Sequence, residues 1–263
     1  MNFAILMKQV PDTDEVKMDL ERGVMIRNGV GGVVNPLDLN ALEAAMRIRE
    51  EGDSVSVLSM GPPKAEESLR ECLALGADRA VLATDAAFAG GDTWATSKVL
   101  AAMLEHTGLP DLVIAGEKAT DGETGQVGPE VAAMLGWPVA THVTGLKRTP
   151  GGVEVVCALE EGILTQRLGT PCLVTVLSFV NDLPLPTLSG KKRAHSLEVE
   201  TLSARDLGIG DGAAGLAASP TRVTRIETPK IARRAEKFMA KRADELEAGL
   251  DRVIEILAGA AIL

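Results

Sequence analysis

The stretch PDLVIAGEKATDGETGQVGPEVAAMLG, from Pro110 to Gly136, decides the fold. It opens with an apolar run that is typical of a buried strand and closes with an apolar run that is typical of a helix. Between the two lies a polar loop, GEKATDGETGQVGP, that is rich in glycine and threonine. Pro129 suits the first turn of a helix, where its missing N–H costs no hydrogen bond. The stretch therefore predicts a strand, a polar loop and a helix, in that order.

The same order of strand and helix recurs through the first half of the chain. Apolar, strand-like runs occupy residues 2–10, 54–61, 79–84 and 110–116. Runs with apolar residues at helical spacing occupy residues 35–52, 64–76, 92–108 and 128–137. Strands that alternate with helices in this way predict an α/β fold with a doubly wound, mostly parallel sheet. Shorter β-prone runs follow, which we expect to extend the same sheet, near residues 139–147, 152–158, 163–168 and 172–179.

The last third of the chain contains three further segments. Residues 181–195, NDLPLPTLSGKKRAH, hold two prolines, a glycine and a basic cluster, which predict an exposed loop. Residues 205–220 are rich in glycine and alanine and predict a linker. From Pro229 the pattern predicts a long charged helix with a heptad-like apolar stripe, made of Met239, Ala243, Leu246, Leu250, Val253 and Leu257. Such a stripe packs either on its own domain or on a partner protein.

The composition argues against several classes of function. The formal net charge of the 263 residues is −10 at pH 7, which makes the chain a poor non-specific partner for nucleic acid or anionic lipid. A bound phosphate would therefore be held by backbone amides and hydroxyls. The three cysteines and three histidines are scattered, so we expect no disulfide framework, metal site or catalytic acid–base residue. Without a signal-peptide pattern or an apolar run of roughly 20 residues, the sequence predicts a cytoplasmic protein.

Polar loops follow four of the predicted strands, where open α/β sheets bind their ligands. These loops are KQVPDTD, SMGP, GGDTWATS and GEKATDGETGQVGP. The last loop leads into a helix, whose free N–H groups would attract an anion. Glycine-rich loops and polar helix caps are also ordinary in α/β proteins. GxxxxGK[ST] does not occur in the chain, and the one match to GxGxxG, GDGAAG at residues 210–215, lies in the predicted linker and follows no predicted strand. The grouping of the loops alone therefore supports a ligand site.

Four segments together resemble the beta subunit of electron transfer flavoprotein. They are MKQVPDT, VVNPLDLNALEAAMRIRE, SMGPPKAEESLRECLALGADRAV and GEKATDGETGQVGPEVAAMLGWP. The resemblance implies a heterodimer with an alpha subunit that carries an electron-transferring FAD. It also implies an adenine nucleotide α-hydrolase-like, or Rossmann-like, domain over residues 1–200 that includes the loop at 181–195. Residues 201–263 would form a linker and a C-terminal arm or helix that clasps the alpha subunit.

The two branches of that family differ in the nucleotide they bind. In the conventional branch the beta subunit holds a structural AMP, and electrons from dehydrogenases pass through the alpha-subunit FAD. In the electron-bifurcating branch it holds a second FAD, which accepts hydride from NADH and splits the electrons between the alpha-subunit FAD and a low-potential acceptor. Conventional members carry DDDxNQTG where this chain has DGETGQVGP, and FAGGDTWATS is similar to bifurcating members. The resemblance favours FAD, with AMP as the alternative.

Carried over by position, the resemblance implies a set of cofactor-binding residues. The adenosine and phosphate cradle would be Gly116, Asp121, Gly122, Glu123, Thr124, Gly125, Gln126 and Val127. The diphosphate and ribityl region would be lined by Asp92, Thr93, Thr96 and Ser97. Further contacts, in part through the backbone, would come from Leu6, Lys8, Asn35, Pro36, Asp38, Met60 and Gly61. In such a site the cofactor does the chemistry and the protein positions it.

The resemblance also implies that residues 181–195 recognise a redox partner. Leu188 matches the anchoring residue of the family's recognition loop, and its basic run matches Lys191, Lys192 and Arg193. The Pro-Arg-Tyr segment that is usual in this loop is absent, which leaves the partner open. The candidates are an acyl-CoA or other dehydrogenase, a quinone oxidoreductase, and ferredoxin or flavodoxin. A third class, ATP-dependent amide or adenylate chemistry, would require an SGGxDS-type phosphate loop, which the chain lacks.

Overall fold

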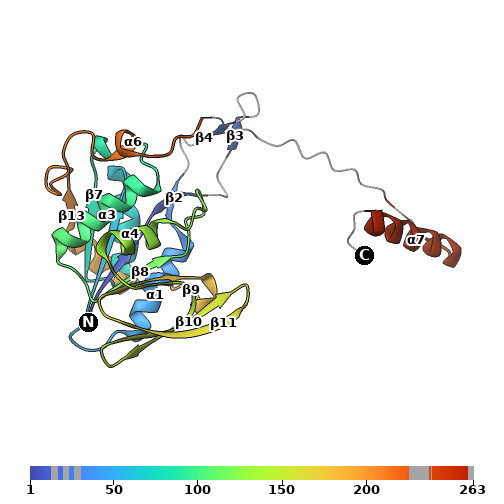
Figure 1. Ribbon diagram of the computed structural model, residues 1–263, viewed down its shortest axis with the longest axis horizontal. Helices are drawn as coiled ribbons and strands as arrows, with labels where there is room; N and C mark the ends of the chain where they lie inside the picture. Colours follow the sequence, from blue (N-terminus) through green and yellow to red (C-terminus); the bar gives the residue numbers. More distant parts are fainter. Residues whose placement is uncertain (13–16, 20–23, 27–30, 225–236, 238, 260–263) are drawn as a thin grey trace. The chain divides into compact units, whose positions relative to one another are not determined.

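The computed structural model describes residues 1–263 except 13–16, 20–23, 27–30, 225–236, 238 and 260–263 (Figure 1). The chain divides into two compact units, Met1–Ile226 and Glu227–Leu263. The first unit contains a nine-stranded sheet in the order β11-β10-β9-β12-β8-β1-β6-β7-β13. The predicted α/β class with a mostly parallel sheet is thereby confirmed.

Most neighbouring strands in the sheet are parallel. The parallel pairs join β1 (Asn2–Leu6), β6 (Ser54–Met60), β7 (Arg79–Ala83), β8 (Leu112–Gly116), β9 (Val139–Thr149), β12 (Cys172–Val176) and β13 (Val199–Leu202). At one edge, β10 (Gly152–Leu159) pairs antiparallel with both β9 and β11 (Gly162–Gly169). Two short antiparallel pairs lie apart from the large sheet: β2 (Gln9–Pro11) with β5 (Gly32–Val34), and β3 (Lys17–Asp19) with β4 (Val24–Ile26).

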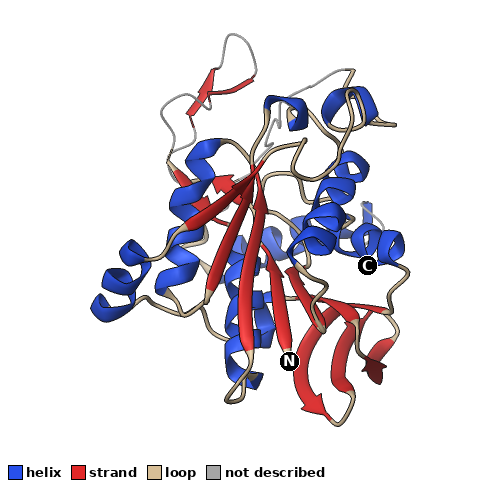
Figure 2. Ribbon diagram, turned by 90° about the vertical axis from the view of Figure 1, so that its left-hand side faces the viewer, coloured by secondary structure: helices blue, strands red, loops and turns tan. Residues whose placement is uncertain are grey.

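Helices cover both faces of the parallel strands (Figure 2). They are α1 (Pro36–Ile48), α2 (Glu66–Ala74), α3 (Thr93–Thr107), α4 (Val127–Leu135), α5 (Leu188–Ser196) and α6 (Gly215–Ala218), with 3₁₀ turns η1 (Pro63–Ala65), η2 (Ala86–Phe88) and η3 (Ser178–Val180). Successive side chains of a strand point to opposite faces, so β1 contributes to two cores. Phe3 and Ile5 pack in the core that contains α1 and α2, whereas Ala4 and Leu6 pack in the core that contains α3 and α4. This is the doubly wound arrangement that the alternating pattern predicted.

The predicted exposed loop at 181–195 needs a correction, because its second half is helical. Thr187 caps α5, and its hydroxyl oxygen accepts the N–H of Gly190 at 3.0 Å. The helix lies on α2, where the guanidinium of Arg193 donates to the carbonyl oxygens of Leu73 at 2.5 Å and Ala77 at 3.0 Å. Leu73 lies in the last turn of α2, where cations are favoured, and Ala77 lies in the turn that follows the helix. Arg193 is therefore bound within the chain, unlike its exposed neighbours Lys191 and Lys192.

We expect Arg193→Ala to lower the free energy of unfolding by about 1–2 kcal/mol, because two carbonyls lose a charged donor. Lys192→Ala is the matched control and should change that free energy by less than about 0.5 kcal/mol. Guanidinium denaturation of both variants beside the unmodified protein measures the difference. Equal losses of unfolding free energy in the two variants would show that the Arg193 side chain contributes no more to stability than the exposed Lys192 side chain.

The predicted linker at 205–220 also needs a correction, because this segment packs on the first unit. The side chain of Ala214 is only 5% exposed and lies in the core under α3. Leu216 donates its N–H to the carbonyl of Ala89 at 3.1 Å. Immediately before the segment, the chain forms β13, which pairs with β7 at the edge of the sheet. Gly215 is closely packed, because a Cβ there would lie 2.3 Å from the carbonyl oxygen of Ala87, whereas a Cβ at Gly208, Gly210 or Gly212 would meet nothing within 4 Å.

The second unit contains one described helix, α7 (Ala243–Gly259). The predicted helix start near Pro229 lies outside the described residues, and Met239 precedes the helix. Leu246, Leu250 and Val253 of the predicted stripe are about half exposed, at 54%, 54% and 45%. The described part of this unit therefore leaves the stripe without a cover. No helix among the described residues is long and apolar enough to cross a membrane.

Candidate nucleotide site

The site predicted at the carboxyl ends of the strands coincides with a reversal in the strand order. From β1 the chain moves outward through β6 to β7, and then returns to place β8 on the other side of β1. In open α/β sheets such a switch point forms the ligand crevice. The loops that leave β1 and β8 begin at this crevice, and α1 starts beside it.

Asp38, in the first turn of α1, holds the two sides of the switch point together. Its Oδ2 accepts the N–H of Lys8, just after β1, at 2.8 Å, and its Oδ1 accepts the N–H of Gly116, at the end of β8, at 3.0 Å. The residue is 6% exposed. Burial raises the pKa of Asp38 to about 7, although the hydrogen bonds from Lys8, Asn35 and Gly116 act in the opposite direction. Asp38 is therefore a buried residue that fixes the positions of the two strand ends beside the crevice.

Asn35 fixes the start of the polar loop in a similar way. Its side-chain amide donates to the carbonyl of Lys118 at 3.0 Å and accepts the N–H of Thr120 at 3.3 Å. Its backbone N–H donates to the carbonyl of Lys8 at 3.0 Å. Because Asn35 is 1% exposed and these groups are occupied, it supports the loop rather than facing a ligand.

The loop from Gly116 to α4 is exposed and pinned at a few points. The ammonium of Lys8 pairs with Asp121 at 2.7 Å, and that of Lys118 lies 3.4 Å from Glu123. Glu123 has a left-handed backbone with φ 51°, as has Gly125 with φ 63°. The other predicted cradle residues, Gly122, Thr124 and Gln126, are exposed. The structure thus gathers the predicted cradle residues on one loop beside the crevice.

The amino end of α4 offers unpaired N–H groups next to this loop. Gln126 is the N-cap residue, but its side chain makes no capping hydrogen bond. Within the described part of the chain, the N–H groups of Val127 and Gly128 have no acceptor. Gly128 lets the helix approach β12 closely, because a Cβ there would lie 2.5 Å from Cγ2 of Thr175. Free N–H groups at a helix start form an anion site when a ligand is present.

The predicted residues on α3 have different roles from one another. Asp92 caps α3 through the N–H of Ala95 at 3.0 Å and also accepts the N–H and hydroxyl of Thr221, at 2.9 and 2.8 Å. Although burial acts in the opposite direction, these bonds lower the pKa of Asp92. Ser97 is fully buried, whereas Thr93 and Thr96 are partly exposed. Only the two threonines are therefore placed to meet a ligand directly.

Sequence reasoning missed several residues of this edge. Glu130, in the first turn of α4, accepts the hydroxyls of Thr93 and Ser97. Glu117 accepts the Thr175 hydroxyl and, at 2.9 Å, the N–H of His142. An acidic residue in the first turn of a helix can be recognised in the sequence as favourable for the helix dipole. The sequence does not indicate which hydroxyl or N–H group its carboxylate will accept. The remaining predicted residues, Leu6, Pro36, Met60 and Gly61, line the core or the strand ends.

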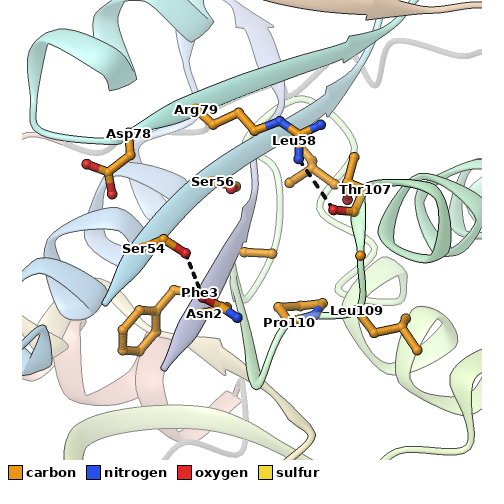
Figure 3. A pocket seen from close by; sticks show the side chains of 12 residues that line it. Asn2, Phe3, Ser54, Ser56, Leu58, Asp78, Arg79, Thr107, Leu109 and Pro110 are labelled. Atoms are coloured by element: carbon orange, nitrogen blue, oxygen red, sulfur yellow. Dashed lines mark hydrogen bonds between the residues drawn. The ribbon is translucent and has the colours of Figure 1, made fainter. Parts of the chain in front are cut away.

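A cavity lined by described residues lies elsewhere, at the amino ends of the strands. It has a volume of about 370 Å³ and is bounded by the start of β1 and β6 and by the turn between α3 and β8 (Figure 3). Its two charged side chains are engaged: Arg79 pairs with Glu200 at 2.5 Å, and Asp78 pairs with Arg49 at 2.8 Å. It therefore has no free charge for a phosphate and lies away from the switch point. Among the described residues no cluster of potential metal ligands occurs.

The residues predicted to recognise a partner lie on α5. Leu188 begins the helix and is 87% exposed, and Leu185 just before it is 89% exposed. Lys191 and Lys192 are exposed on the following turn. Together these four residues, here called the α5 surface, combine an apolar anchor with positive charge. Arg193 is not part of this surface.

Comparison with known proteins places the chain in a family. The model of the electron transfer flavoprotein domain matches residues 22–207. Electron transfer flavoprotein subunit beta of Thermoanaerobacterium thermosaccharolyticum is 44% identical over 240 residues, which cover 90% of this chain and 92% of that protein. Caffeyl-CoA reductase-Etf complex subunit CarD of Acetobacterium woodii is 42% identical over 252 residues, 95% and 96% of the two chains. Electron transfer flavoprotein subunit beta of Megasphaera elsdenii is 37% identical over the full length of both.

Proposed function

This chain belongs to the electron transfer flavoprotein family, and from that membership we propose that it is a beta subunit whose switch-point crevice holds FAD. When bound there, FAD supplies the redox chemistry, taking hydride from NADH and passing one electron to the alpha-subunit FAD and one to a low-potential acceptor such as ferredoxin or flavodoxin. The alternative is a structural AMP, with electrons passing through the alpha-subunit FAD alone. A cytoplasmic location remains part of the proposal.

The observation that carries the proposal is the pair of acceptor-free N–H groups at the start of α4. These groups belong to Val127, which is partly exposed, and to Gly128, which is buried, and they follow a polar loop whose residues 121–124 are exposed. The helix dipole adds positive potential at the same point. The site can therefore bind a phosphate without a basic field, which fits a chain whose net charge is −10.

The α3 side of the crevice supports a ligand longer than AMP. Thr96 is partly exposed, and its hydroxyl is bonded to no other described residue. Thr93, one turn earlier, lies against Gln126 at 3.2 Å, so α3 and the cradle loop are in contact. AMP ends at its single phosphate, whereas FAD continues through a second phosphate and a ribityl chain. A ligand that uses both helices favours FAD.

One observation favours the AMP alternative. The carboxylate of Glu130 lies between the first turns of α3 and α4. A second phosphate placed there would meet a negative charge instead of a donor.

The nucleotide content of the heterodimer distinguishes FAD from AMP as the ligand of this chain. The chain is co-expressed with its alpha subunit, the purified complex is denatured, and the released nucleotides are quantified by chromatography. Two FAD per heterodimer support the proposal. One FAD and one AMP support the conventional alternative, and one FAD with no second nucleotide would contradict both.

The proposal includes two kinds of protein partner. One relative is named as a subunit of a caffeyl-CoA reductase-Etf complex, and by that analogy we propose an acyl-CoA or related dehydrogenase as the redox partner. The α5 surface would dock it, with Leu188 as the anchor. The alpha subunit would be clasped by the apolar stripe of α7, which has no cover within its own unit.

We expect Leu250→Asp to raise the dissociation constant of the heterodimer at least tenfold, about 1.4 kcal/mol, because it places a charge in the middle of the stripe. Ala248→Asp puts the same charge on the opposite face of α7 and should change the constant less than about twofold. Titration of labelled alpha subunit against each variant measures both values. An unchanged constant for Leu250→Asp would place the stripe outside the interface.

A further inference from the structure

The two edges of the nine-stranded sheet differ in how well they are protected. At one edge, β13 has four residues, and its Glu200 pairs with Arg79. At the other edge, β11 has eight residues, GILTQRLG, and pairs only with β10 among the described strands (Figure 1). Proteins protect sheet edges with short strands, charged side chains or proline, because free backbone groups pair with other chains. β11 contains one charged residue, Arg167, and no proline, so this edge is open to pairing.

The turn between β10 and β11 determines which backbone groups of β11 are free. The turn consists of residues 160–161, and Leu159 and Gly162 face each other on either side of it. In a two-residue hairpin these closing residues bond each other, and along an antiparallel pair every second residue bonds the neighbouring strand. The N–H and C=O groups of Ile163 and Thr165 therefore point away from β10, toward the open edge.

The side chains at this edge are apolar and exposed. Ile163 is 71% exposed and Leu164 is 43% exposed, and Leu159 at the end of β10 is 40% exposed. Leu164 lies opposite Cys157, which belongs to the core, so Leu164 forms the rim of that core. Apolar side chains beside free backbone groups are the features of a strand that pairs with another chain.

The sequence of β11 is complementary to itself when two copies pair antiparallel about a two-fold axis. The free backbone groups allow Ile163 of one copy to exchange two hydrogen bonds with Thr165 of the other. In that register Leu164 meets Leu164 of the other copy on the axis, and Arg167 lies beside Glu161 of the turn. The two-fold axis repeats the contact between Arg167 and Glu161 at both ends of the paired strands. A shift of the register in either direction separates these two charges.

Arg167 can contact a second copy without losing its contact within the chain. Its guanidinium pairs with Glu154 of β10 at 2.9 Å, and the side chain is 75% exposed. A guanidinium has five N–H donors, so one carboxylate does not use them all. Glu161 is exposed in the turn and can accept the remaining donors from the other copy.

We propose that β11 is a self-association edge, through which a second copy of this chain continues the sheet across a two-fold axis. The occupant is a second copy because the edge matches itself in charge and in apolar contacts. Pairing along one strand buries a small area, so we expect a weak association with a dissociation constant on the order of 10 μM. The proposal goes beyond the proposed function and holds for either nucleotide.

Sedimentation equilibrium of the heterodimer with the alpha subunit measures this association. Arg167→Glu should raise the dissociation constant between heterodimers at least tenfold, because glutamates then face each other at both ends of the interface. Adding Glu161→Arg to that variant should restore the constant to within about threefold. Both variants lack the contact with Glu154, so the recovery reports the contact between copies. Glu105→Arg, an exposed change on α3, is the control and should alter the constant less than about twofold.

A second pair of variants tests the backbone contacts of the edge. Thr165→Pro removes the N–H that points away from β10, and an edge strand tolerates proline at such a position. We expect it to raise the dissociation constant between heterodimers at least tenfold. Thr165→Val keeps the N–H and should change the constant less than about twofold. The melting temperature of each variant shows whether the hairpin is retained.

Three results would overturn the proposal. Unmodified heterodimer that stays single at about 100 μM would mean that the edge does not pair in solution. A defect in Arg167→Glu without recovery in the double variant would mean that Arg167 does not face Glu161. Weaker binding of the alpha subunit by Thr165→Pro would assign the edge to that subunit instead of a second copy. None of these results depends on the nucleotide content, so they are distinct from a failure of the proposed function.

Discussion

Gly116→Ala is expected to lower the free energy of unfolding by about 3 kcal/mol and to abolish retention of the proposed nucleotide, because the switch point has no room for a single added carbon. A Cβ at this position would lie 2.5 Å from Oδ1 of Asp38 and 2.7 and 2.8 Å from Cβ and the carbonyl carbon of Leu37. The Leu37 carbon is backbone, so a rotamer change does not relieve the contact. The start of α1 must move, and Asp38 then loses the N–H of Gly116.

Gly122→Ala provides the control for this prediction. Gly122 lies in the same loop, but a Cβ there would meet nothing within 4 Å. It should change the free energy of unfolding by less than about 0.5 kcal/mol. Guanidinium denaturation measures this quantity for both variants, and chromatography of released nucleotide applies to Gly116→Ala. A Gly116→Ala protein as stable as Gly122→Ala would show that α1 is not seated against β8 as described.

The regular part of the fold was predictable because it rests on local patterns. Strands such as β6 carry apolar residues with a period of two, and helices such as α3 carry them with a period of 3.6. Both periods can be recognised without any tertiary information. The exceptions depend on contacts between distant segments. The four residues of β13 form a strand because β7 presents a free edge, and α5 forms a helix because Thr187 caps it and α2 supports it. The two prolines before α5 and Gly190 within it indicated a loop, but the Thr187 cap and the contacts with α2 stabilise a helix there.

The grouping of the candidate loops at one edge was predictable from the sequence, whereas the contacts of their side chains were predictable only in part. Polar residues after several parallel strands must meet at one edge, so the cradle loop and the start of α3 were expected to be near each other. Which side chains face the ligand depends on hydrogen bonds across long sequence distances. Asp38 is occupied by the N–H groups of Lys8 and Gly116, and Asn35 is occupied by the backbone of Lys118 and Thr120 in the loop after Gly116. Glu130 was missed because its two hydroxyl partners come from another helix.

Asp38→Asn is expected to remove a pH dependence of stability of about 4 kcal/mol between pH 4 and pH 7. Burial raises the pKa of Asp38 from 3.8 to about 7 in the folded protein. Between these two values the folded state holds a proton that the unfolded chain has released. The contribution of Asp38 to stability is therefore fully present below pH 4, declines as the pH rises, and is lost above pH 7. Asparagine does not titrate, so its variant lacks this slope.

The measurement is the difference in unfolding free energy between the two proteins at several pH values. Other titrating groups contribute equally to both proteins and cancel in the difference. Asparagine keeps one carbonyl oxygen for Lys8 or Gly116 and loses the other acceptor, a cost that does not vary with pH and offsets the whole curve. The slope of this difference against pH measures the effect of the proton on Asp38. Its constant offset measures the cost of the lost hydrogen bond. A flat difference across pH 4 to 7 would mean that Asp38 is ionised throughout and that the two backbone N–H groups outweigh its burial, in which case the switch point is held by a full negative charge.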